Sequence, residues 1–479
     1  MKIFLLILIS ICVFSSFTSA TFASEPNNKF GIHIVNISKE EAGEASRLVN
    51  SNGGDWGYVT FIIQSNDRDK IKWQEFFNEL RRSHLIPIVR ISTKPAGDSW
   101  EAPRDVDAKE WADFLDSLVW PVNTRYVTIY NEPNHGTEWG RETDPASYAK
   151  VLDQTINELK NKSKDFFVLN AGLDASAPNQ SPAYYDEEKF IRAMNKTVPG
   201  IFEKLDGWSS HSYPNPAFSG SPNDKGRGTI ETYKWELALL KSLQVQKNLP
   251  VFITETGWQI GTLTPEKISE YYKEAFDKVW SDDRVMAVTP FVLNYTHPPF
   301  EAFSFLIPSG KEESAKILGA KFPQYYPAYE TIFNIPKVKA KVDQRHSAKQ
   351  LSGSISGTLR PSENYYAHYS FENIGLSIWG EENDLKVIIK ADAADSEVKI
   401  LKKEGDIEPG DQYEFLLRLN PKTPGSQSVE IYLEDSKGVI DGTRQLTNFE
   451  AIGRIEQIKR LSSSLLNEVI GNIKERFSR

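Results

Sequence analysis

The chain has 479 residues, of which 39% are hydrophobic and 25% are charged, as in ordinary globular proteins. Its 65 acidic and 56 basic residues give a net charge of −9, which disfavours nucleic acid as a partner. The length predicts several domains, and the composition excludes collagen, a disulfide scaffold and a protein with many membrane spans.

Residues 1–23 have the pattern of a secretory signal peptide. Lys2 gives a positive start, residues 3–14 form an apolar run, and small residues follow. The run is too short for an ordinary membrane span, and an uncleaved anchor is the alternative. We therefore expect a secreted protein, extracellular or periplasmic, with no membrane span in the mature chain. Cys12, the only cysteine, lies in this segment, so the mature chain has no disulfide.

Residues 28–336 alternate β-rich runs with amphipathic stretches. Strands are predicted at 30–35, 56–63, 85–91, 125–130, 165–172, 205–213, 249–254 and 287–295. Helices are predicted at 39–50, 72–83, 108–118, 145–160, 187–195, 230–246, 265–280 and 328–333. Eight such units predict an α/β fold with a parallel sheet closed into a (β/α)8 TIM barrel. No Gly-x-Gly-x-x-Gly follows the first strand, which argues against a dinucleotide fold.

The sequence after Pro336 changes in character. Residues 337–360 are polar and are predicted to be a linker or a wrapped edge. Short runs at 365–371, 376–379, 385–390, 413–419 and 429–433 are separated by turn residues. They predict a small β-sandwich accessory domain, which with its linker spans 337–447. We expect it to have a structural role, with sugar binding as the alternative.

Residues 448–479 are predicted to form a C-terminal amphipathic helix with Asn448 as its N-cap. Because a continuous apolar face is unfavourable in water, we expect this helix to dock on the sandwich or the barrel. A partner or a membrane surface is the alternative, but the modest positive charge of the helix disfavours lipid.

Two glutamates lie at the ends of the fourth and seventh predicted strands, in 131-Asn-Glu-Pro-133 and 254-Thr-Glu-Thr-256. Functional groups of a parallel barrel lie at the C-terminal strand ends, and these two strands face each other across its mouth. Glu132 and Glu255 can therefore converge. Cleavage of a glycosidic bond needs two carboxyl groups, one to protonate the leaving oxygen and one to attack or stabilise the anomeric carbon. A spacing of about 5–5.5 Å gives retention, which we expect here.

Asn-Glu-Pro on strand four with Glu on strand seven resembles the retaining clan A glycoside hydrolases. Residues 131–134, Glu138-Trp139 and residues 145–149 are similar to the β-xylosidase and α-iduronidase family, and residues 254–258 to several clan A families. The resemblance covers residues 28–336. It implies that Glu132 is the acid/base, that Glu255 is the nucleophile, and that Asn131 binds the sugar 2-hydroxyl.

Further substrate-binding candidates lie near the strand ends. His211 and Tyr213 share one side of strand six by their period-two spacing, and the resemblance implies contacts with the acid/base and the nucleophile. Arg90 is placed to pair with Glu255 or a sugar hydroxyl, a structural ion pair being the alternative. The remaining candidates are His33, Trp139, Trp258 and Tyr295. Many clan members have a Trp at the end of strand eight, where this chain offers Phe291 or Tyr295.

The predicted function is a secreted retaining glycoside hydrolase that cleaves a β-linked poly- or oligosaccharide by double displacement. The alternative is a non-catalytic carbohydrate-binding or scaffolding surface protein on the same barrel. The seven His are scattered without a His-x-x-x-His pair, so we expect no metal, and no cofactor. The expected partner is the carbohydrate substrate, with the protein as a monomer. Residues 215–228 form a long loop after strand six, which we expect to border the substrate groove.

Overall fold

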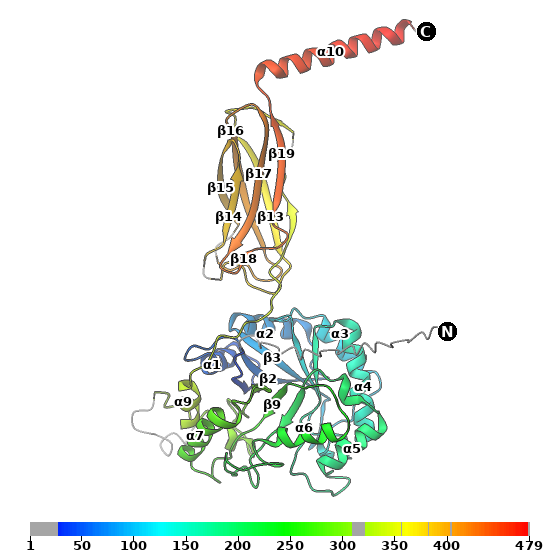
Figure 1. The fold of residues 1–479 in the computed structure, drawn as a ribbon, viewed down its shortest axis with the longest axis vertical. Helices are drawn as coiled ribbons and strands as arrows, with labels where there is room; N and C mark the ends of the chain where they lie inside the picture. Colours follow the sequence, from blue (N-terminus) through cyan, green and yellow to red (C-terminus); the bar gives the residue numbers. More distant parts are fainter. Residues whose placement is uncertain (1–26, 309–320, 356, 382, 403–404, 478–479) are drawn as a thin grey trace, which may run out of the picture.

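The computed structural model describes residues 27–308, 321–355, 357–381, 383–402 and 405–477 (Figure 1). The predicted signal peptide lies outside the described residues. Within these ranges, no helix combines the length and the apolar composition needed to cross a membrane.

The first part of the chain contains two parallel sheets. One has the order β1 (Gly31–His33), β2 (Gly57–Gln64), β3 (Leu85–Ser92), β6 (Arg125–Ile129) and β7 (Phe166–Leu169). The other contains β8 (Trp208–His211), β9 (Val251–Glu255) and β10 (Val285–Val288), with β9 in the middle. Parallel bridges join Leu169 to Gly207 and Phe30 to Val288, so the outer strands of the two sheets lie side by side at both edges.

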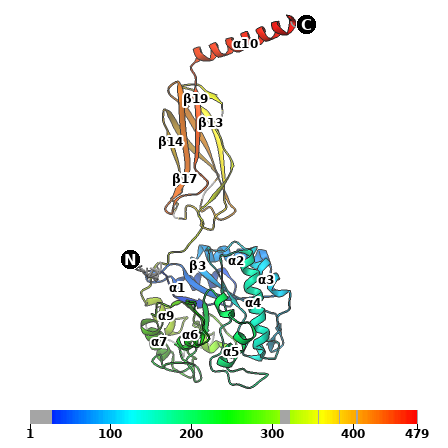
Figure 2. The same ribbon diagram turned by 45° about the vertical axis from the view of Figure 1, so that its right-hand side comes forward.

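Helices surround the parallel strands (Figures 1 and 2). They are α1 (Lys39–Val49), α2 (Lys70–Arg82), α3 (Asp107–Asp116), α4 (Pro145–Lys162), α5 (Glu187–Thr197), α6 (Thr232–Ser242), α7 (Pro265–Glu274) and α9 (Pro327–Asn334), with short turns η1 (Gly136–Glu138), η2 (Ile201–Lys204), η3 (Ala275–Val279) and η4 (Phe300–Phe303). Several begin at a side chain that accepts from the first-turn N–H groups, as Ser38, Asp69, Asp144 and Thr264 do. The strands are apolar on both faces because the helices cover them; all eight residues of β3 are buried.

The predicted strands and helices of this part agree with the structure except at the last strand. The run 287–295 was expected to be strand, but β10 covers Val285–Val288 only. Pro290 has no N–H to donate to a sheet, and the Thr289 hydroxyl donates to the Thr254 carbonyl at 2.9 Å. The chain therefore leaves the sheet early. A small hairpin, β4 (Pro95–Ala96) with β5 (Ser99–Trp100), follows β3 and was not predicted.

The second part of the chain has two mainly antiparallel sheets. The first has the order β11 (Ala348–Ser352), β13 (Tyr365–Asn373), β16 (Gln412–Pro421) and β15 (Ala394–Lys402). The second has the order β12 (Thr358–Leu359), β19 (Gln445–Ala451), β17 (Gly425–Asp435) and β14 (Lys386–Ala391), with β18 (Gly438–Val439) beside β17. Both sheets contribute to one buried apolar cluster that includes Tyr369, Phe415, Val429 and Ile431.

The segment 337–360, predicted to be a linker or a wrapped edge, contains β11 and β12, each at the edge of its sheet. Two other predictions for this part are wrong. Residues 376–379 form no strand apart from a bridge between Trp379 and Ile407. Strands β15 and β19 were not predicted, because β15 carries Asp, Glu and Lys at its outward positions and β19 carries Thr, Asn and Glu. Asn448 does not cap a helix, because it lies within β19 and pairs with Ser428.

The last helix, α10 (Arg454–Phe477), projects from the end of the two sheets (Figures 1 and 2). Its apolar side chains are exposed, for example Ile455 at 74% and Leu465 at 62%. The expectation that this helix docks on the rest of the protein is therefore wrong. The reason is the path of the chain: β19 runs to Ala451 at the far end of its sheet, and only Ile452 and Gly453 separate it from the helix.

Ion pairs join the two parts beside α2. Arg82 donates to both carboxylate oxygens of Glu408 at 2.6 and 2.8 Å. The His84 ring lies between Asp55 and Glu381, with nitrogen–oxygen distances of 2.7 and 2.8 Å, and stacks on Trp56. These contacts, together with a hydrogen bond from the Asn123 N–H to the Asp343 carbonyl, orient the antiparallel sheets on the first part.

Candidate active site

The two predicted glutamates lie at the C-terminal ends of β6 and β9, two parallel strands with β7 and β8 between them. Glu255 is the last residue of β9, and Glu132 follows β6 by three residues. Tyr130 and Glu132 have positive φ values of 68° and 30°, a conformation that is strained for residues with a Cβ. The Glu132 N–H donates to the Gly172 carbonyl at 3.1 Å, and the Glu132 carbonyl accepts from the His135 N–H at 2.7 Å. These bonds hold the bend that turns the Glu132 side chain toward Glu255.

A carboxylate oxygen of Glu132, one of Glu255 and a ring nitrogen of His211 all lie within 4.8 Å of one another. His211 Nδ1 is 2.7 Å from Glu132 Oε1 and 3.8 Å from Glu255 Oε2. The structure thus places His211 beside both carboxylates. Burial disfavours the charged imidazole, but Glu255 and the hydrogen bond to Glu132 raise the pKa of His211.

Glu255 is buried among donors. The Arg90 guanidinium donates to its Oε1 atom, and the Tyr213 hydroxyl donates to Oε2 at 3.1 Å. Burial alone would raise the pKa of Glu255, but His211, Arg90 and His33 outweigh it and lower that pKa to about 2. Glu255 is therefore an ionised carboxylate over the whole ordinary pH range.

His33 lies under Glu255, with its Nε2 atom 3.9 Å from Oε1. The side chain is fully buried, and neither ring nitrogen has a hydrogen-bond partner among the described residues. Burial, and then the nearby Arg90, lower the pKa of His33 to about 3, so the ring is neutral. Its Nε2 atom thus lies close to Glu255, and its contact with a substrate stays a prediction.

Three further polar residues surround Glu132, and sequence reasoning missed them. His135 Nδ1 is 3.8 Å from Glu132 Oε2, while its Nε2 lies 2.8 Å from Asp174 Oδ2. Glu138 bonds to the Asn131 amide, whose oxygen in turn accepts from Arg90 at 2.7 Å. Burial, and then Glu132, raise the pKa of Glu138 to about 7. His135 and Glu138 reach the site because η1 turns the chain back after Pro133, and strand periodicity carries no signal for such a turn.

Aromatic side chains form one wall beside Tyr213. Phe218, from the loop after β8, lies 5.1 Å from the Tyr213 ring and 5.0 Å from Phe303. Phe291 lies edge-on to His33 at 5.1 Å, and Phe300 is 5.9 Å from Tyr295. The long loop 215–228 thus contacts Tyr213 through Phe218, and its place beside a substrate groove stays a prediction. Phe291, rather than Tyr295, is the strand-eight aromatic that packs beside His33.

Two predicted sugar contacts are wrong. Trp139 is 3% exposed and packs edge-on against Tyr130 and Tyr148. Trp258 is 2% exposed, packs on Tyr272 and donates its Nε1 hydrogen to the Gly220 carbonyl at 2.8 Å. Neither ring presents a face to a ligand, because each turns into the layer between strands and helices.

The cluster of Glu132, His211 and Glu255 also offers three ligand atoms of the kinds that metals bind. Arg90 already donates to Glu255, and Tyr213 donates to its other oxygen. A guanidinium at this position repels a second cation, so the arrangement fits an uncharged ligand with hydroxyl groups better than a metal ion.

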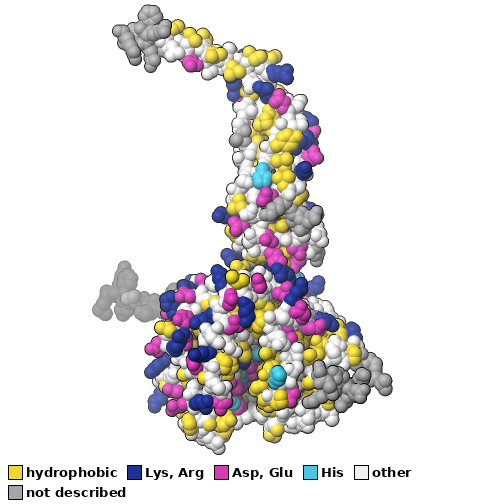
Figure 3. Space-filling view, turned by 180° about the vertical axis from the view of Figure 1, so that it is seen from behind, with side chains coloured by type: hydrophobic (Ala, Val, Ile, Leu, Met, Phe, Trp, Pro, Cys, Tyr) yellow, Lys and Arg dark blue, Asp and Glu magenta, His cyan; other side chains and the backbone are white. Residues whose placement is uncertain are grey.

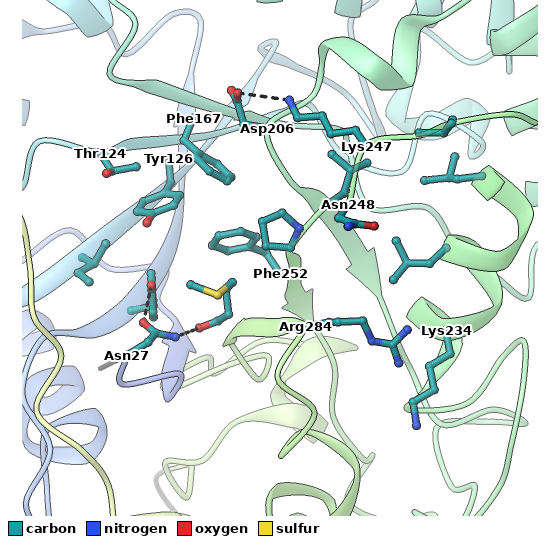
Figure 4. Close-up of a pocket in the computed structure, with 18 of the residues that line it drawn as sticks. Asn27, Thr124, Tyr126, Phe167, Asp206, Lys234, Lys247, Asn248, Phe252 and Arg284 are labelled. Carbon is teal, nitrogen blue, oxygen red and sulfur yellow. Dashed lines mark hydrogen bonds and ion pairs between the residues drawn. The ribbon is translucent and has the colours of Figure 1, made fainter. Parts of the chain in front are cut away.

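A cavity of about 1450 Å³ lies at the opposite ends of the strands, with Tyr126, Phe167 and Phe252 in its wall (Figure 4). These residues occupy the beginnings of β6, β7 and β9, so this cavity is remote from Glu132 and Glu255. Basic residues at its rim are paired within the chain, Lys247 with Asp206, Lys234 with Glu231 and Arg284 with Asp282. Glu132 and Glu255 are therefore not among the residues that line this cavity.

No family model matches this chain, and no curated protein matches it. Solved structures that are similar to it include a family 39 glycoside hydrolase from Bacteroides cellulosilyticus WH2, with 14% identity, 83% of this chain and 81% of the other covered, and a TM-score of 0.44. A glycoside hydrolase family 30 subfamily 8 xylanase from Clostridium acetobutylicum is similar at 11% identity, with coverages of 83% and 98% and a TM-score of 0.39. A family 51 α-L-arabinofuranosidase from Bifidobacterium longum is similar at 9% identity, with coverages of 83% and 97% and a TM-score of 0.42. These three solved structures are all glycoside hydrolases.

Proposed function

We propose that this protein is a retaining glycoside hydrolase that acts on a β-linked poly- or oligosaccharide, with its site at the open end of a (β/α)8 barrel. The observation that carries the proposal is the pair of carboxylates, whose oxygens come within 4.8 Å at two strand ends. This separation suits direct attack by one carboxylate on the anomeric carbon, and leaves less room than the about 6.5–9.5 Å that an intervening water needs.

In the first step Glu255 attacks the anomeric carbon while Glu132 protonates the departing glycosidic oxygen. A covalent glycosyl-enzyme forms, and the leaving alcohol carries away the proton of Glu132. Glu255 suits the nucleophile because it is held ionised, with a pKa of about 2. The Tyr213 hydroxyl and Arg90 fix its two oxygens, so that its orientation does not need to change during attack.

In the second step Glu132, now ionised, takes a proton from water as that water attacks the same carbon and displaces Glu255. His211 contacts both acids and so keeps them at a constant separation in both steps. Asn131 precedes Glu132 in the chain and its side-chain oxygen accepts from Arg90, and we assign it the sugar 2-hydroxyl.

The two acids can be distinguished by substitution and rescue. With an aryl β-glycoside whose phenol needs no protonation, Glu132→Ala should still form the glycosyl-enzyme but should hydrolyse it slowly. Added azide should then raise turnover and produce a β-glycosyl azide, because a small anion can enter the space left by the carboxylate. Glu255→Ala should lose turnover by about 10³-fold or more, and azide should give the α-product.

A panel of aryl β-glycosides and polysaccharides identifies the sugar that the enzyme hydrolyses. Glu231→Ala, at a buried acid outside the site, is the matched control for the two substitutions and should keep turnover. Turnover by Glu255→Ala equal to that of the wild type would contradict the assignment of the nucleophile. Binding of a polysaccharide without hydrolysis by the wild type would favour a non-catalytic carbohydrate-binding protein instead.

We also propose export of the chain, with a barrel over 28–336 and a β-sandwich after it. The pattern of residues 1–23 supports export, and the two antiparallel sheets around one apolar cluster support the sandwich. Mass spectrometry of the mature N-terminus in the producing cell tests the first point, and a retained Met1 would contradict it.

A further inference from the structure

The C-terminal helix α10 exposes an unusual number of large aliphatic side chains. Eight of them are between 41% and 74% exposed: Ile455, Ile458, Leu461, Leu465, Leu466, Val469, Ile470 and Ile473. Hydrophobic side chains follow the projecting helix in the space-filling view (Figure 3). A contiguous apolar surface of this kind on a water-soluble protein marks a site of interaction.

The apolar side chains occupy about half of the circumference of the helix. At about 100° per residue they cover an arc of about 180°, from Leu461 at one edge to Ile470 at the other. A two-stranded coiled coil buries only the narrower seam of two positions in seven. A second copy of the helix would therefore leave the edges of this arc in water.

A bundle of several copies would cover the whole arc, but Arg454 and Lys459 lie about 20° inside its two edges, where neighbouring copies would meet. Such a bundle would bring these cations of identical helices together and take them partly out of water, which is unfavourable. At the surface of a lipid layer the same lysine lies along the apolar face and extends its ammonium group to the head groups. Lys459 therefore favours a flat lipid surface over a bundle.

We propose that α10 binds flat on a phospholipid surface, with the arc from Leu461 to Ile470 buried among the acyl chains. The helix is 24 residues long, about 36 Å, and lies beyond the end of the antiparallel sheets, where nothing else in the described chain covers it. It lies on the layer and does not cross it.

The charges of α10 define the kind of lipid surface. Its described side chains carry four cations, Arg454, Lys459, Arg460 and Lys474, against the anions Glu456 and Glu468, a net charge of +2. Arg460 already pairs with Glu450 at 2.9 Å. The face opposite the apolar arc carries Arg460, Lys474, Glu456 and Glu468, whose charges cancel, together with Ser463, Ser464 and Asn467. Binding therefore depends on apolar insertion, and zwitterionic phospholipid suffices for it.

The test is co-flotation of the mature full-length protein with vesicles of pure phosphatidylcholine. We expect the wild type to float with small sonicated vesicles, with less than a twofold change between 0.1 and 0.5 M NaCl. The variant Leu465→Asp/Val469→Asp adds two charges to the apolar arc and should reduce the bound fraction at least tenfold. The control Ser463→Asp/Asn467→Asp adds the same charges at the same spacing on the opposite face and should bind within twofold of the wild type.

Both double variants should keep the melting temperature of the wild type, which separates lost binding from lost folding. The proposal is overturned if the wild type does not float, or if both variants float as well as it does. Sedimentation without lipid gives the other decisive result. A wild-type dimer or tetramer that Leu465→Asp/Val469→Asp converts to monomer, with no flotation, would show that a second copy covers the helix.

Discussion

The ionisation of Glu255 depends on neighbours from three other strands. Burial on its own would protonate this carboxylate, and the positive charge of Arg90 and His211 reverses that tendency. Arg90 comes from β3, His211 from β8 and His33 from β1. The nucleophile is therefore prepared by the assembled strands, and no single segment could produce it.

Replacement of Arg90 should shift the acidic limb of the pH profile. Glu255 must be ionised to attack, and its pKa of about 2 places the loss of activity below pH 4 in the wild type. Arg90→Gln removes an adjacent cation, so the pKa of Glu255 should rise by about 1–3 units and the acidic limb of kcat/KM with it. The measurement is kcat/KM between pH 3 and 8 on the best aryl glycoside.

The control is Arg104→Gln, at an exposed arginine outside the site, which should leave the acidic limb in place. An acidic limb that does not move in Arg90→Gln, with turnover intact, would mean that Arg90 does not set the ionisation of Glu255.

At the residue scale, the motifs predicted the two acids and the neighbours that lie on strands. Strand parity placed His211 and Tyr213 on one side, and both contact the acids. His135, Asp174 and Glu138 were missed, because they reach Glu132 through turns that have no periodic pattern. Trp139 and Trp258 were misassigned, because a position just after a strand end does not determine whether a ring faces the cleft or the helices.

At the scale of elements, the first part of the chain was predictable because strands and helices alternate with different hydrophobic periods. The second part was less so. Strand β15 begins with the polar run 395–397 and has a register shift between Ile400 and Lys402, and β19 has few apolar residues, so neither differs clearly from a loop in sequence. The position of α10 was not predictable either. An amphipathic pattern identifies the apolar face of a helix, but it does not identify the surface that contacts this face.

Removal of α10 should leave the rest of the protein as stable as before. A chain that ends at Ile452 keeps β19 and loses only side chains that are mostly exposed. We expect its melting temperature to lie within about 2 °C of that of the full chain. A chain that ends at Arg444 is the comparison, since it also loses β19 and its pairing with β17 and should be strongly destabilised. A fall of more than about 5 °C on removal of α10 alone would mean that the helix docks on the sheets in solution.

The loop after β8 should affect substrate binding through Phe218. This residue has a φ of 53° and places its ring against Tyr213 and Phe303. Phe218→Ala should raise KM for oligosaccharides about five- to twentyfold, with a smaller change in kcat, because it removes aromatic area without touching either acid. Tyr366→Ala, at a side chain 61% exposed on β13, is the control and should leave both constants unchanged. Equal kinetics of Phe218→Ala and wild type would place the loop outside the substrate groove.

At the scale of the whole molecule, His84 connects the two parts. Burial lowers the pKa of His84, but hydrogen bonds to Asp55 and Glu381 outweigh that effect and raise it to about 9. Since the folded pKa lies above the ordinary value of 6.5, the stabilisation is complete below pH 6.5 and is lost as the pH rises to about 9.

His84→Gln should therefore be less stable than the wild type by about 2–3 kcal/mol at pH 6, and the difference should shrink toward pH 9.5. Chemical denaturation at several pH values measures it. His368→Gln, at an exposed histidine that pairs with Glu414 within one sheet pair, is the control. A difference that does not depend on pH would show that the ring acts by stacking on Trp56 and not by its charge.

The antiparallel sheets also set the distance between the first part of the chain and α10. Strand β17 has 11 residues and spans about 36 Å, and the ion pairs at Arg82 and His84 restrict rotation at its base. With α10 on a lipid layer, the antiparallel sheets would hold the active site at a fixed height above that layer. Polysaccharide chains at that height would be reached by diffusion of the enzyme along the lipid layer. Polysaccharide chains farther from the layer would not be reached. The choice of substrate would then depend on its distance from the lipid layer as well as on its chemistry. A longer or shorter pair of antiparallel sheets would change the distance at which hydrolysis occurs without changing any residue of the active site.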